Sequence, residues 1–574
     1  MKNTRYNIIV LIVLIGLSFG SCEVLEPENT NTYDIEDVKS FVTYAEGVLL
    51  TAYENLPGDH NNFPLSYGCD DAVTNDQGNS VKTAVAGGWT SDANPFETWN
   101  ASYESILYIN TFLEEMAEVE WFWSDYTISA LYTWRLMGEA YGLRAWYYFS
   151  LLQAHAGLGT NGEILGVPIV DHAVDADNPD DYEVPRSTFN QLVQFIVTDC
   201  DSAIANLPDR YENTGTYTYD EAMGEQYTNR INGLSVRLIK AKTLLYAASP
   251  AYSDGTYTYQ QAAEEAAAIM DLNDGLANVN FANQSHLQFY NNEDVATNNL
   301  HPEVFWYSSR TTNNSWEANN YPPSMYGRGR SDPTQNLVNA FTMLDGTPVT
   351  EAKINSSDPY SDRDPRLSMY ILYNGATIDR SGSILTINTK AGSQDAMGSS
   401  DQNTTLTGYY MRKFMNVTDV NLDPSVNSSG TRYYTFARYT DALLMFAEAA
   451  NQAAGPDGNV GGYTARVVIN ALRDRAGITS TGYVDGLNKD QMTELIKNER
   501  RIEMCYEKQR FWDLRRWNMI NEMKQPVNGV QVSSDGTAYS YVTVENRNYQ
   551  DYQIYGPIPY GETQKYEIVQ NQGW

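Results

Sequence analysis

Residues 498–517 read NERRIEMCYEKQRFWDLRRW, and this stretch decides the fold. Eleven of the 21 residues from Lys497 to Trp517 are charged, yet large apolar side chains are interspersed among them. A solvated helix does not need so many large apolar groups, and an ordinary core helix does not carry so many charges. We therefore expect a helix packed on several sides, with Arg and Asp/Glu paired in planar hydrogen-bonded contacts, Arg510 among them. The alternative is a solvated helix held by pairs among Glu503, Glu507 and Lys508.

Helical periodicity extends well beyond this stretch. Apolar spacing predicts helices at residues 38–56, 99–113, 138–153, 187–207, 232–249 and 439–453. In three of them small residues alternate with aromatic ones, which lets a neighbouring helix approach closely. Paired helices of this kind are typical of degenerate tetratricopeptide hairpins, although their spacing along the chain is irregular.

The pattern changes between about residues 276 and 434. Short β-type runs at residues 303–307 and 384–388 alternate with loops rich in Asn, Gly, Ser and Pro. A loop-rich segment of this length within a compact protein is usually functional. The predicted fold is therefore mainly α, with tetratricopeptide-like helical hairpins that scaffold a loop-rich region containing short β-strands.

The start of the chain predicts secretion. Lys2 and Arg5 precede an apolar run at residues 8–19, and small residues then lead into Cys22. The run is too short to span a membrane, so residues 1–21 are interpreted as a signal peptide. A cysteine at this place predicts lipidation at Cys22, followed by a polar lipidated tether over residues 22–36. Acyl chains would hold such a protein firmly at a membrane.

Composition excludes several other classes. The formal charge of −34 repels nucleic acid and anionic lipid surfaces. Cys69, Cys200 and Cys505 are odd in number and form no C-x-x-C, so we expect small buried side chains in place of disulfides or zinc ligands. The five His residues are scattered, and no cofactor motif is present, so neither a metal nor a cofactor is expected.

Catalytic motifs fail on their context. A G-x-S-x-G match at residues 16–20 lies inside the signal, and a G-x-G-x-x-G match at residues 157–162 follows a helix instead of a strand. Asp70–Asp71 could be one half of a glycosidase carboxylate pair, but nothing in the sequence supports a second half. We therefore expect no catalytic residues.

The sequence also carries a resemblance. Residues 499–517, which read E-R-R-x-E-x-x-x-E-x-x-R-F-W-D-L-R-R-W, resemble the signature of the SusD/RagB family, although the family often has glycine where Lys508 stands. Four further stretches lie along nearly the whole mature chain in the order typical of that family: GEAYGLRAWYYF, GVPIV, DRDPRL and PIPYGE. The resemblance implies an N-terminal helical part at residues 37–275 and a C-terminal part at residues 276–574, packed as one unit.

The function that the resemblance implies is nutrient capture. SusD-like proteins are non-catalytic lipoproteins on the outside of the outer membrane, and they deliver oligosaccharide or polysaccharide ligands to a SusC-like TonB-dependent transporter. RagB-like members handle peptides, so a peptide ligand is the first alternative. A surface glycosidase or a structural lipoprotein is the second.

Two loops carry the residue types that sugar binding requires, at residues 87–100 and 310–330. Sugar C–H faces stack on aromatic rings, and hydroxyl groups need planar polar partners. In SusD-like proteins the ligand site is made from loops in corresponding parts of the chain. The predicted stacking residues are Trp89, Trp316, Tyr321 and Tyr326, with Asn94, Asn320 and Arg328 as hydrogen-bonding partners. Each aromatic could instead pack inside its loop, and Trp99 and Trp306 are expected in the core.

Overall fold

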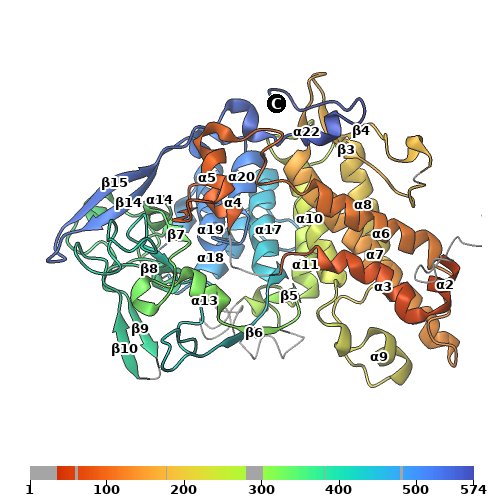
Figure 1. Cartoon of the computed structure of the whole chain (residues 1–574), viewed down its shortest axis with the longest axis horizontal. Coiled ribbons are helices and arrows are strands. Elements are labelled where there is room, and N and C mark those ends of the chain that lie inside the picture. Colours follow the sequence, from red (N-terminus) through yellow and green to blue (C-terminus); the bar gives the residue numbers. More distant parts are fainter. Residues whose placement is uncertain (1–34, 59–62, 176, 280–300, 381, 479–481) are drawn as a thin grey trace, which may run out of the picture.

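The computed structural model describes residues 35–58, 63–175, 177–279, 301–380, 382–478 and 482–574. The predicted signal peptide and Cys22 lie outside the described residues. Helices fill the centre and one side of the molecule, and loops with short strands fill the other side (Figure 1). The prediction of a mainly α fold is confirmed. Within the described ranges, no helix combines the length and the hydropathy needed to cross a membrane.

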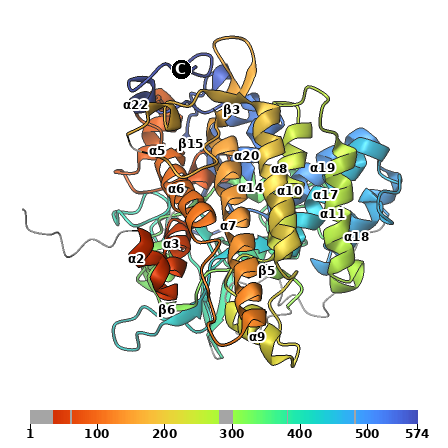
Figure 2. The ribbon, with the colours of Figure 1, turned by 90° about the vertical axis from the view of Figure 1, so that its right-hand side faces the viewer.

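The scaffold is a series of long helices that pack side by side in chain order (Figure 2). They are α3 (Val42–Glu54), α6 (Trp99–Glu115), α7 (Tyr126–His155), α8 (Phe189–Asn206), α10 (Gly233–Ala248), α11 (Tyr259–Leu272), α17 (Tyr439–Ala454) and α19 (Lys489–Glu503). Each contacts the next, as the helices of tetratricopeptide-like hairpins do. Each helix predicted from periodicity is present. The predicted helix at residues 38–56 is divided at Phe41, whose backbone is extended.

Shorter helices cover the ends and edges of this scaffold. They are α2 (Ile35–Ser40), α4 (Pro64–Tyr67), α5 (Ser80–Thr83), α9 (Tyr217–Met223), α13 (Ser315–Asn320), α14 (Gln335–Ala340), α15 (Glu351–Ile354), α16 (Pro365–Tyr370), α18 (Ala465–Arg475), α20 (Arg510–Arg516), α21 (Ile520–Met523) and α22 (Tyr560–Thr563). Side-chain caps set several boundaries. Thr188 caps α8 in a reciprocal box with Gln191, so the helix begins at Phe189, two residues after its predicted start.

The strands are short and pair antiparallel. They are β1 (Ala72–Val73), β2 (Gly157–Leu158), β3 (Ile164–Pro168), β4 (Arg186–Thr188), β5 (Val304–Tyr307), β6 (Thr311–Asn313), β7 (Asp332–Pro333), β8 (Ile371–Leu372), β9 (Thr377–Arg380), β10 (Ser383–Thr386), β11 (Tyr410–Met411), β12 (Gly430–Arg432), β13 (Thr435–Arg438), β14 (Val527–Val532) and β15 (Tyr539–Glu545). The pairs are β1–β7, β5–β13, β6–β12, β8–β11, β9–β10 and β14–β15, with β2–β3–β4 as a small sheet. Several pairs join distant segments: Ala72 lies opposite Pro333.

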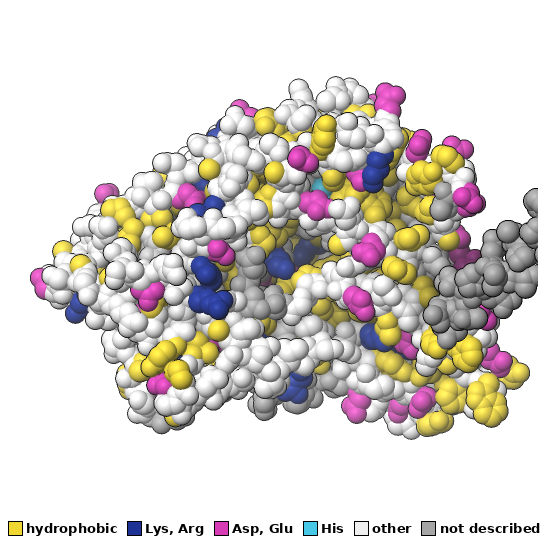
Figure 3. Space-filling model, viewed as in Figure 1, with side chains coloured by type: hydrophobic (Ala, Val, Ile, Leu, Met, Phe, Trp, Pro, Cys, Tyr) yellow, Lys and Arg dark blue, Asp and Glu magenta, His cyan; other side chains and the backbone are white. Residues whose placement is uncertain are grey.

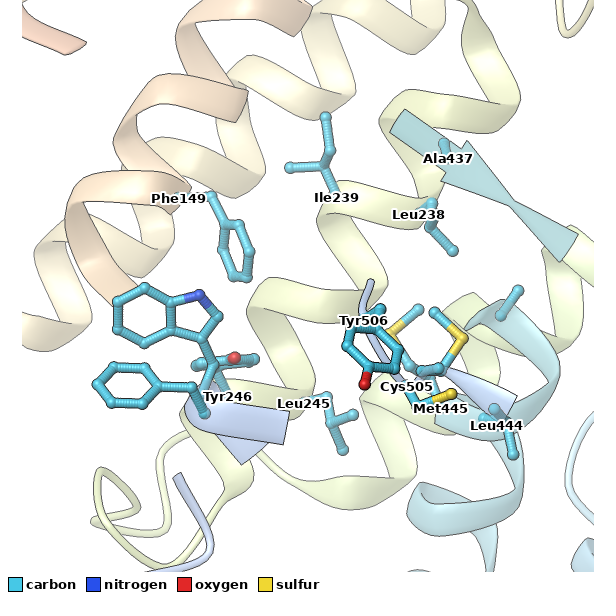
Figure 4. Close-up of a cluster of buried hydrophobic side chains, with 14 of the residues drawn as sticks. Phe149, Leu238, Ile239, Leu245, Tyr246, Ala437, Leu444, Met445, Cys505 and Tyr506 are labelled. Atoms are coloured by element: carbon cyan, nitrogen blue, oxygen red, sulfur yellow. The ribbon is translucent and has the colours of Figure 1, made fainter. Parts of the chain in front are cut away.

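The core lies where α7, α10 and α17 meet the turn that follows α19. Figure 4 shows Phe149, Ile239, Tyr246, Met445 and Tyr506 from these segments within one cluster of buried hydrophobic side chains. Every residue of α17 from Tyr439 to Asn451 is buried, so this helix passes through the middle of the protein with partners on all sides. The three described cysteines are buried and unbridged, as expected.

The stretch at residues 498–517 forms the end of α19, a turn, and α20. Four of its five arginines, all except Arg515, are paired with buried carboxylates. Arg500 donates to Asp441 and Asp513, at 2.8 Å to each, and Arg510 donates to Asp70 at 3.0 Å. The interpretation as a helix packed on several sides is confirmed, because burial of both partners requires such pairing. The solvated-helix alternative is wrong. It requires Glu503, Glu507 and Lys508 to pair along one helix, but α19 ends at Glu503.

Two neighbouring arginines depart from expectation. The sequence suggests that Arg515 or Arg516 is more exposed than Arg510, but both are at most 1% exposed. Arg516 donates to both carboxylate oxygens of Glu448, at 2.5 and 2.6 Å. Arg515 lies within 5.0 Å of the Trp512 ring and donates to the Ile554 carbonyl at 2.6 Å. Aromatic and carbonyl groups thus accommodate a buried guanidinium that charge pattern alone places at the surface.

The turn between α19 and α20 keeps a left-handed backbone without glycine. Lys508 has φ +64°, and Tyr506 has the same value two residues earlier. Glycine adopts this conformation freely, whereas a side chain makes it cost about 1–2 kcal/mol. The family that the sequence resembles often has glycine at position 508. The structure shows Lys508 there, in the left-handed conformation that glycine adopts freely.

Candidate functional site

The first predicted loop does not present its tryptophan to solvent. Trp89 is 2% exposed, and its ring packs against Phe96 and Trp574 at centroid distances of 5.0 and 4.9 Å. Its indole Nε1 donates to Asn94 Oδ1 at 2.9 Å, and the same oxygen accepts from the Phe96 backbone. The expectation of an exposed stacking ring at Trp89 is therefore wrong. Asn94 instead stabilises the loop, because its side-chain oxygen supplies the acceptor that the buried Trp89 indole N–H needs.

The second predicted loop is also largely internal. Trp316, Asn320 and Tyr321 are all at most 2% exposed, because residues 315–320 form helix α13. Beside the Trp316 ring lies Arg432, whose guanidinium carbon is 4.7 Å from the ring centroid. Arg432 in turn pairs with the buried Glu317 at 2.7 Å, and this pair draws the segment inward. The expectation that Trp316, Asn320 and Tyr321 form an exposed platform is therefore wrong.

Tyr326 and Arg328 are the predicted site residues that remain at the surface. Tyr326 is 58% exposed and has φ +64°, and Arg328 is exposed as well. Their role in binding stays a prediction. Trp99 and Trp306 are 5% and 0% exposed, so their expected place in the core is confirmed.

A cavity of about 330 Å³ lies at the junction of α7, α10, β13 and the turn at residues 504–509. Figure 3 shows a hollow near the middle of one face, with basic and hydrophobic side chains in it. The cavity reaches the core cluster of Figure 4, because Phe149, Ile239 and Ala437 belong to both. A concave site where helices meet a strand, with apolar walls and a few polar groups, is typical of small-molecule binding.

Aromatic side chains make up part of the cavity wall. Trp146 and Phe436 are half-buried, with ring centroids 6.1 Å apart, and Tyr434 lies 5.3 Å from Phe436. The buried Trp306 ring packs against both of these rings, with its centroid 5.3 Å from that of Trp146 and 4.4 Å from that of Phe436. Rings fixed in this way can offer partly exposed faces to an apolar ligand surface with little loss of side-chain entropy.

Polar side chains also line the cavity, among them Asn55, Ser150, Gln153 and Gln509. Gln153 Nε2 donates to the Tyr246 hydroxyl at 2.6 Å, which holds the amide in place. Planar amides and hydroxyls beside aromatic rings are the residue set that sugars require. The sequence predicts this set in the two loops, whereas in the structure it comes together from helix ends, α7 and β13.

Charged groups in the cavity are largely paired with one another. Lys242 lies 2.6 Å from Asp441, and Arg438 lies 2.7 Å from Glu507. Burial raises the pKa of Asp441, but Lys242 and Arg500 more than offset that effect, and its pKa lies below the ordinary value.

Positive-φ residues collect at the cavity as well, since Phe414 (φ +70°) and Lys508 line it. Such backbone conformations are concentrated at functional sites.

The carboxylates of Asp70 and Asp71 form ion pairs that stabilise the fold. Together with the Cys69 thiol, their ligand atoms lie within 4.8 Å of one another, a spacing that could suit a metal ion. Arg501, however, pairs with both carboxylates at 2.8 Å, and Arg510 pairs with Asp70. Two guanidinium cations already supply the positive charge that a metal would bring. Burial raises the pKa of Asp70, yet the two arginines hold it below its ordinary value.

Comparison with known proteins agrees with this architecture. The sequence model of the SusD family matches residues 249–574, and one described as starch-binding and associating with the outer membrane matches residues 23–222. SusD-like protein P38 of Formosa agariphila is 22% identical over 556 residues, which is 92% of this chain and 95% of that protein. SusD-like protein P25 of the same organism is 33% identical over 156 residues, 27% of this chain and 26% of that protein.

Solved structures share the fold. A SusD-like protein from Bacteroides fragilis superposes with a TM-score of 0.76 at 21% identity, covering 96% of this chain and 100% of that one. A laminarin-binding SusD-like protein superposes with a TM-score of 0.55 at 22% identity, covering 93% of this chain and 99% of that one. The SusD family model covers more than half of the sequence, and the helical scaffold is the one that its members share. The chain belongs to the SusD family, which includes carbohydrate-binding proteins.

Proposed function

We propose that this protein is a non-catalytic, lipid-anchored receptor on the outside of the outer membrane. It captures oligosaccharide and delivers it to a SusC-like TonB-dependent transporter. The observation that carries the proposal is the central cavity, where half-buried Trp146 and Phe436 lie beside Gln153 and Gln509. Membership of a family that includes starch-binding proteins associating with the outer membrane supports a glycan as the ligand.

The expected affinity is modest. A ring stacked on a sugar contributes about 0.5–1.5 kcal/mol beyond its buried area. Several such contacts are needed to offset the translational and rotational freedom that a ligand loses on binding. A cavity with two half-buried rings and a few amides therefore suits reversible capture, which delivery to a transporter requires.

The membrane part of the proposal rests on the sequence around Cys22. Cys22→Ala should move the protein from the membrane fraction to the soluble fraction, because the acyl chains would be absent. A variant that stays with the membrane after a carbonate wash would contradict lipidation at this residue. Co-purification of the lipidated protein with a TonB-dependent barrel from the native outer membrane would test the proposed delivery step.

The binding test uses the soluble Cys22→Ala protein. Calorimetric titration with a panel of neutral and charged oligosaccharides, and with peptides, should give saturable binding to a glycan. Chromatography of the same mixtures after long incubation should show the glycan unchanged. Cleavage products would favour the glycosidase alternative, and binding of peptides alone would favour the RagB-like one.

A further inference from the structure

Lys508 differs from the other charged residues of the cavity. Its ammonium Nζ lies 4.8 Å from the centroid of the Tyr434 ring, and its side chain is half-buried in the cavity wall. Within the described part of the chain, no carboxylate lies within 4.0 Å of this nitrogen. A cation held in a concave site without a carboxylate partner retains its capacity to donate hydrogen bonds to a ligand.

The remaining cavity charges are already engaged by the protein. Lys242 pairs with Asp441 at 2.6 Å. Glu507 pairs with Arg438 at 2.7 Å and with Lys413 at 2.6 Å. Glu97 accepts from the Asn100 backbone N–H at 3.1 Å, at the start of α6. Among the described lining residues, Lys508 is therefore the cation without a carboxylate partner, and Glu97 is the carboxylate without a cation.

The backbone at Lys508 gives an independent argument. Its φ of +64° is a conformation that glycine adopts without strain and other residues adopt at a cost. A strained non-glycine residue persists where the surroundings hold it, and such residues collect at ligand sites. Here the strained position carries the one cavity ammonium that no described carboxylate neutralises.

We propose that Lys508 selects an anionic glycan, one whose sugar units carry a carboxylate or a sulfate group. This inference rests on the proposed function of the cavity and specifies its ligand class. A partly desolvated ammonium gains a charge-assisted hydrogen bond from an anionic group, which a neutral hydroxyl cannot match. Stacking on Trp146 and Phe436 would then hold the sugar ring beside the ammonium.

The net charge of −34 does not oppose this assignment. At physiological ionic strength the Debye length is about 8 Å, so distant surface carboxylates are screened from a ligand inside the cavity. Within the cavity the nearby carboxylates of Glu507 and Asp441 are neutralised by their own cations. Local contact with Lys508 decides the preference.

The test compares three ligands by calorimetry on the soluble Cys22→Ala protein: laminari-oligosaccharides (neutral), oligogalacturonate (carboxylate) and carrageenan oligosaccharides (sulfate). Lys508→Met keeps the length and the backbone strain but removes the charge. Lys508→Arg keeps the charge. We expect one of the anionic ligands to bind about tenfold or more tightly than the neutral one, and the stronger of the two identifies the anion. This preference should fall in Lys508→Met, persist in Lys508→Arg and weaken with added salt.

Three results would overturn the inference. Equal or tighter binding of the neutral ligand would show that Lys508 does not select anions. An anionic preference that survives Lys508→Met would assign the selection to another residue. Both of these leave glycan capture intact. Failure of the parent protein to bind either anionic glycan would reject this inference, whereas failure to bind any glycan of the wider panel would reject glycan capture itself.

Discussion

Arg510 and Asp70 are 440 residues apart in the chain and form a two-point ion pair, with Nε 3.0 Å from Oδ1 and Nη2 3.2 Å from Oδ2. The pair joins α20 to the segment between α4 and β1. Arg510→Ala should lower the free energy of unfolding by about 3–5 kcal/mol, because it leaves a buried carboxylate without one of its partners. Arg501, 2.8 Å from Asp70, keeps the loss toward the lower end of that range. Chemical denaturation measures it.

A surface pair on the neighbouring helix is the matched control. Glu494 pairs with Lys497 at 2.9 Å and its side chain is 69% exposed. Glu494→Ala should change stability by less than about 1 kcal/mol, since solvent screens this pair. Equal effects of Arg510→Ala and Glu494→Ala would mean that the Arg510 pair contributes no more than a surface contact.

Arg516 should be at least as costly to remove as Arg510. Its guanidinium serves both Glu448 and Asp513, which are 4% and 2% exposed. Arg516→Ala leaves two buried carboxylates short of a partner, so we expect a loss of about 3–5 kcal/mol or a failure to fold. Arg516→Lys restores the charge without the planar two-point contact, and should recover part of the loss. Full stability of Arg516→Ala in denaturation experiments would contradict this.

His155 should make the protein less stable in mild acid. Burial, together with the nearby cations Arg515 and Arg186, lowers its pKa from 6.5 to about 4. Its Nδ1 lies 2.7 Å from the Pro557 carbonyl, so the neutral ring donates there. Below pH 6.5 the unfolded chain binds a proton that the folded protein does not. The stabilisation is therefore complete above pH 6.5 and is lost toward pH 4, by about 3 kcal/mol.

His155→Gln isolates this effect, since glutamine can donate to Pro557 without titrating. Denaturation midpoints of the variant should depend less on pH between 6.5 and 4 than those of the parent protein. Parallel curves for the two proteins would show that other groups set the acid sensitivity.

Lys508→Gly should separate stability from binding. Glycine removes the strain of a left-handed backbone at φ +64°, and its extra freedom in the unfolded chain offsets part of that gain. The free energy of unfolding should rise by up to about 1 kcal/mol, seen as a higher melting temperature. Lys508→Met retains the strain and serves as the control. A clear fall in stability for Lys508→Gly would mean that the contact with Tyr434 outweighs the strain.

The scaffold could be predicted from the sequence because its signals are local. Small and aromatic residues alternate along α7, α10 and α17, and the charges of residues 498–517 demand buried partners. The sequence could not name those partners, since Asp70 and Glu448 are distant in the chain. It also could not show that Arg515 is buried, because carbonyl and aromatic partners leave no charge pattern.

The site was harder to predict because exposure is a tertiary property. Trp316 stands in a polar Asn-rich segment that is typical of a surface loop, yet the Glu317–Arg432 pair carries it inside. Trp146, in contrast, lies in a strongly helical stretch that is typical of a core, yet one side of it faces the cavity. Periodicity assigns a face of a helix, but it does not reveal where neighbouring helices leave a gap.

The position of the glycan site can be decided with substitutions that spare the fold. Phe436→Leu keeps apolar volume but removes the ring, so we expect about two- to tenfold weaker glycan binding with little change in melting temperature. Tyr326→Ala removes the exposed ring of the second loop and should leave affinity unchanged if the cavity is the site. Trp123, 85% exposed, provides the control for loss of a surface aromatic, and Trp123→Ala should also bind normally.

Trp316→Ala is the contrasting variant, because it removes a buried ring of the second loop and should affect stability. It should lower the free energy of unfolding by about 3–5 kcal/mol through the cavity it creates, whatever its effect on binding. Calorimetric titration of all four variants with one glycan that the parent protein binds gives the answer. Weaker binding in Tyr326→Ala together with normal binding in Phe436→Leu would place the site on the surface around Tyr326 and Arg328. The reverse result places it in the central cavity, where rings supported by Trp306 form the stacking surface.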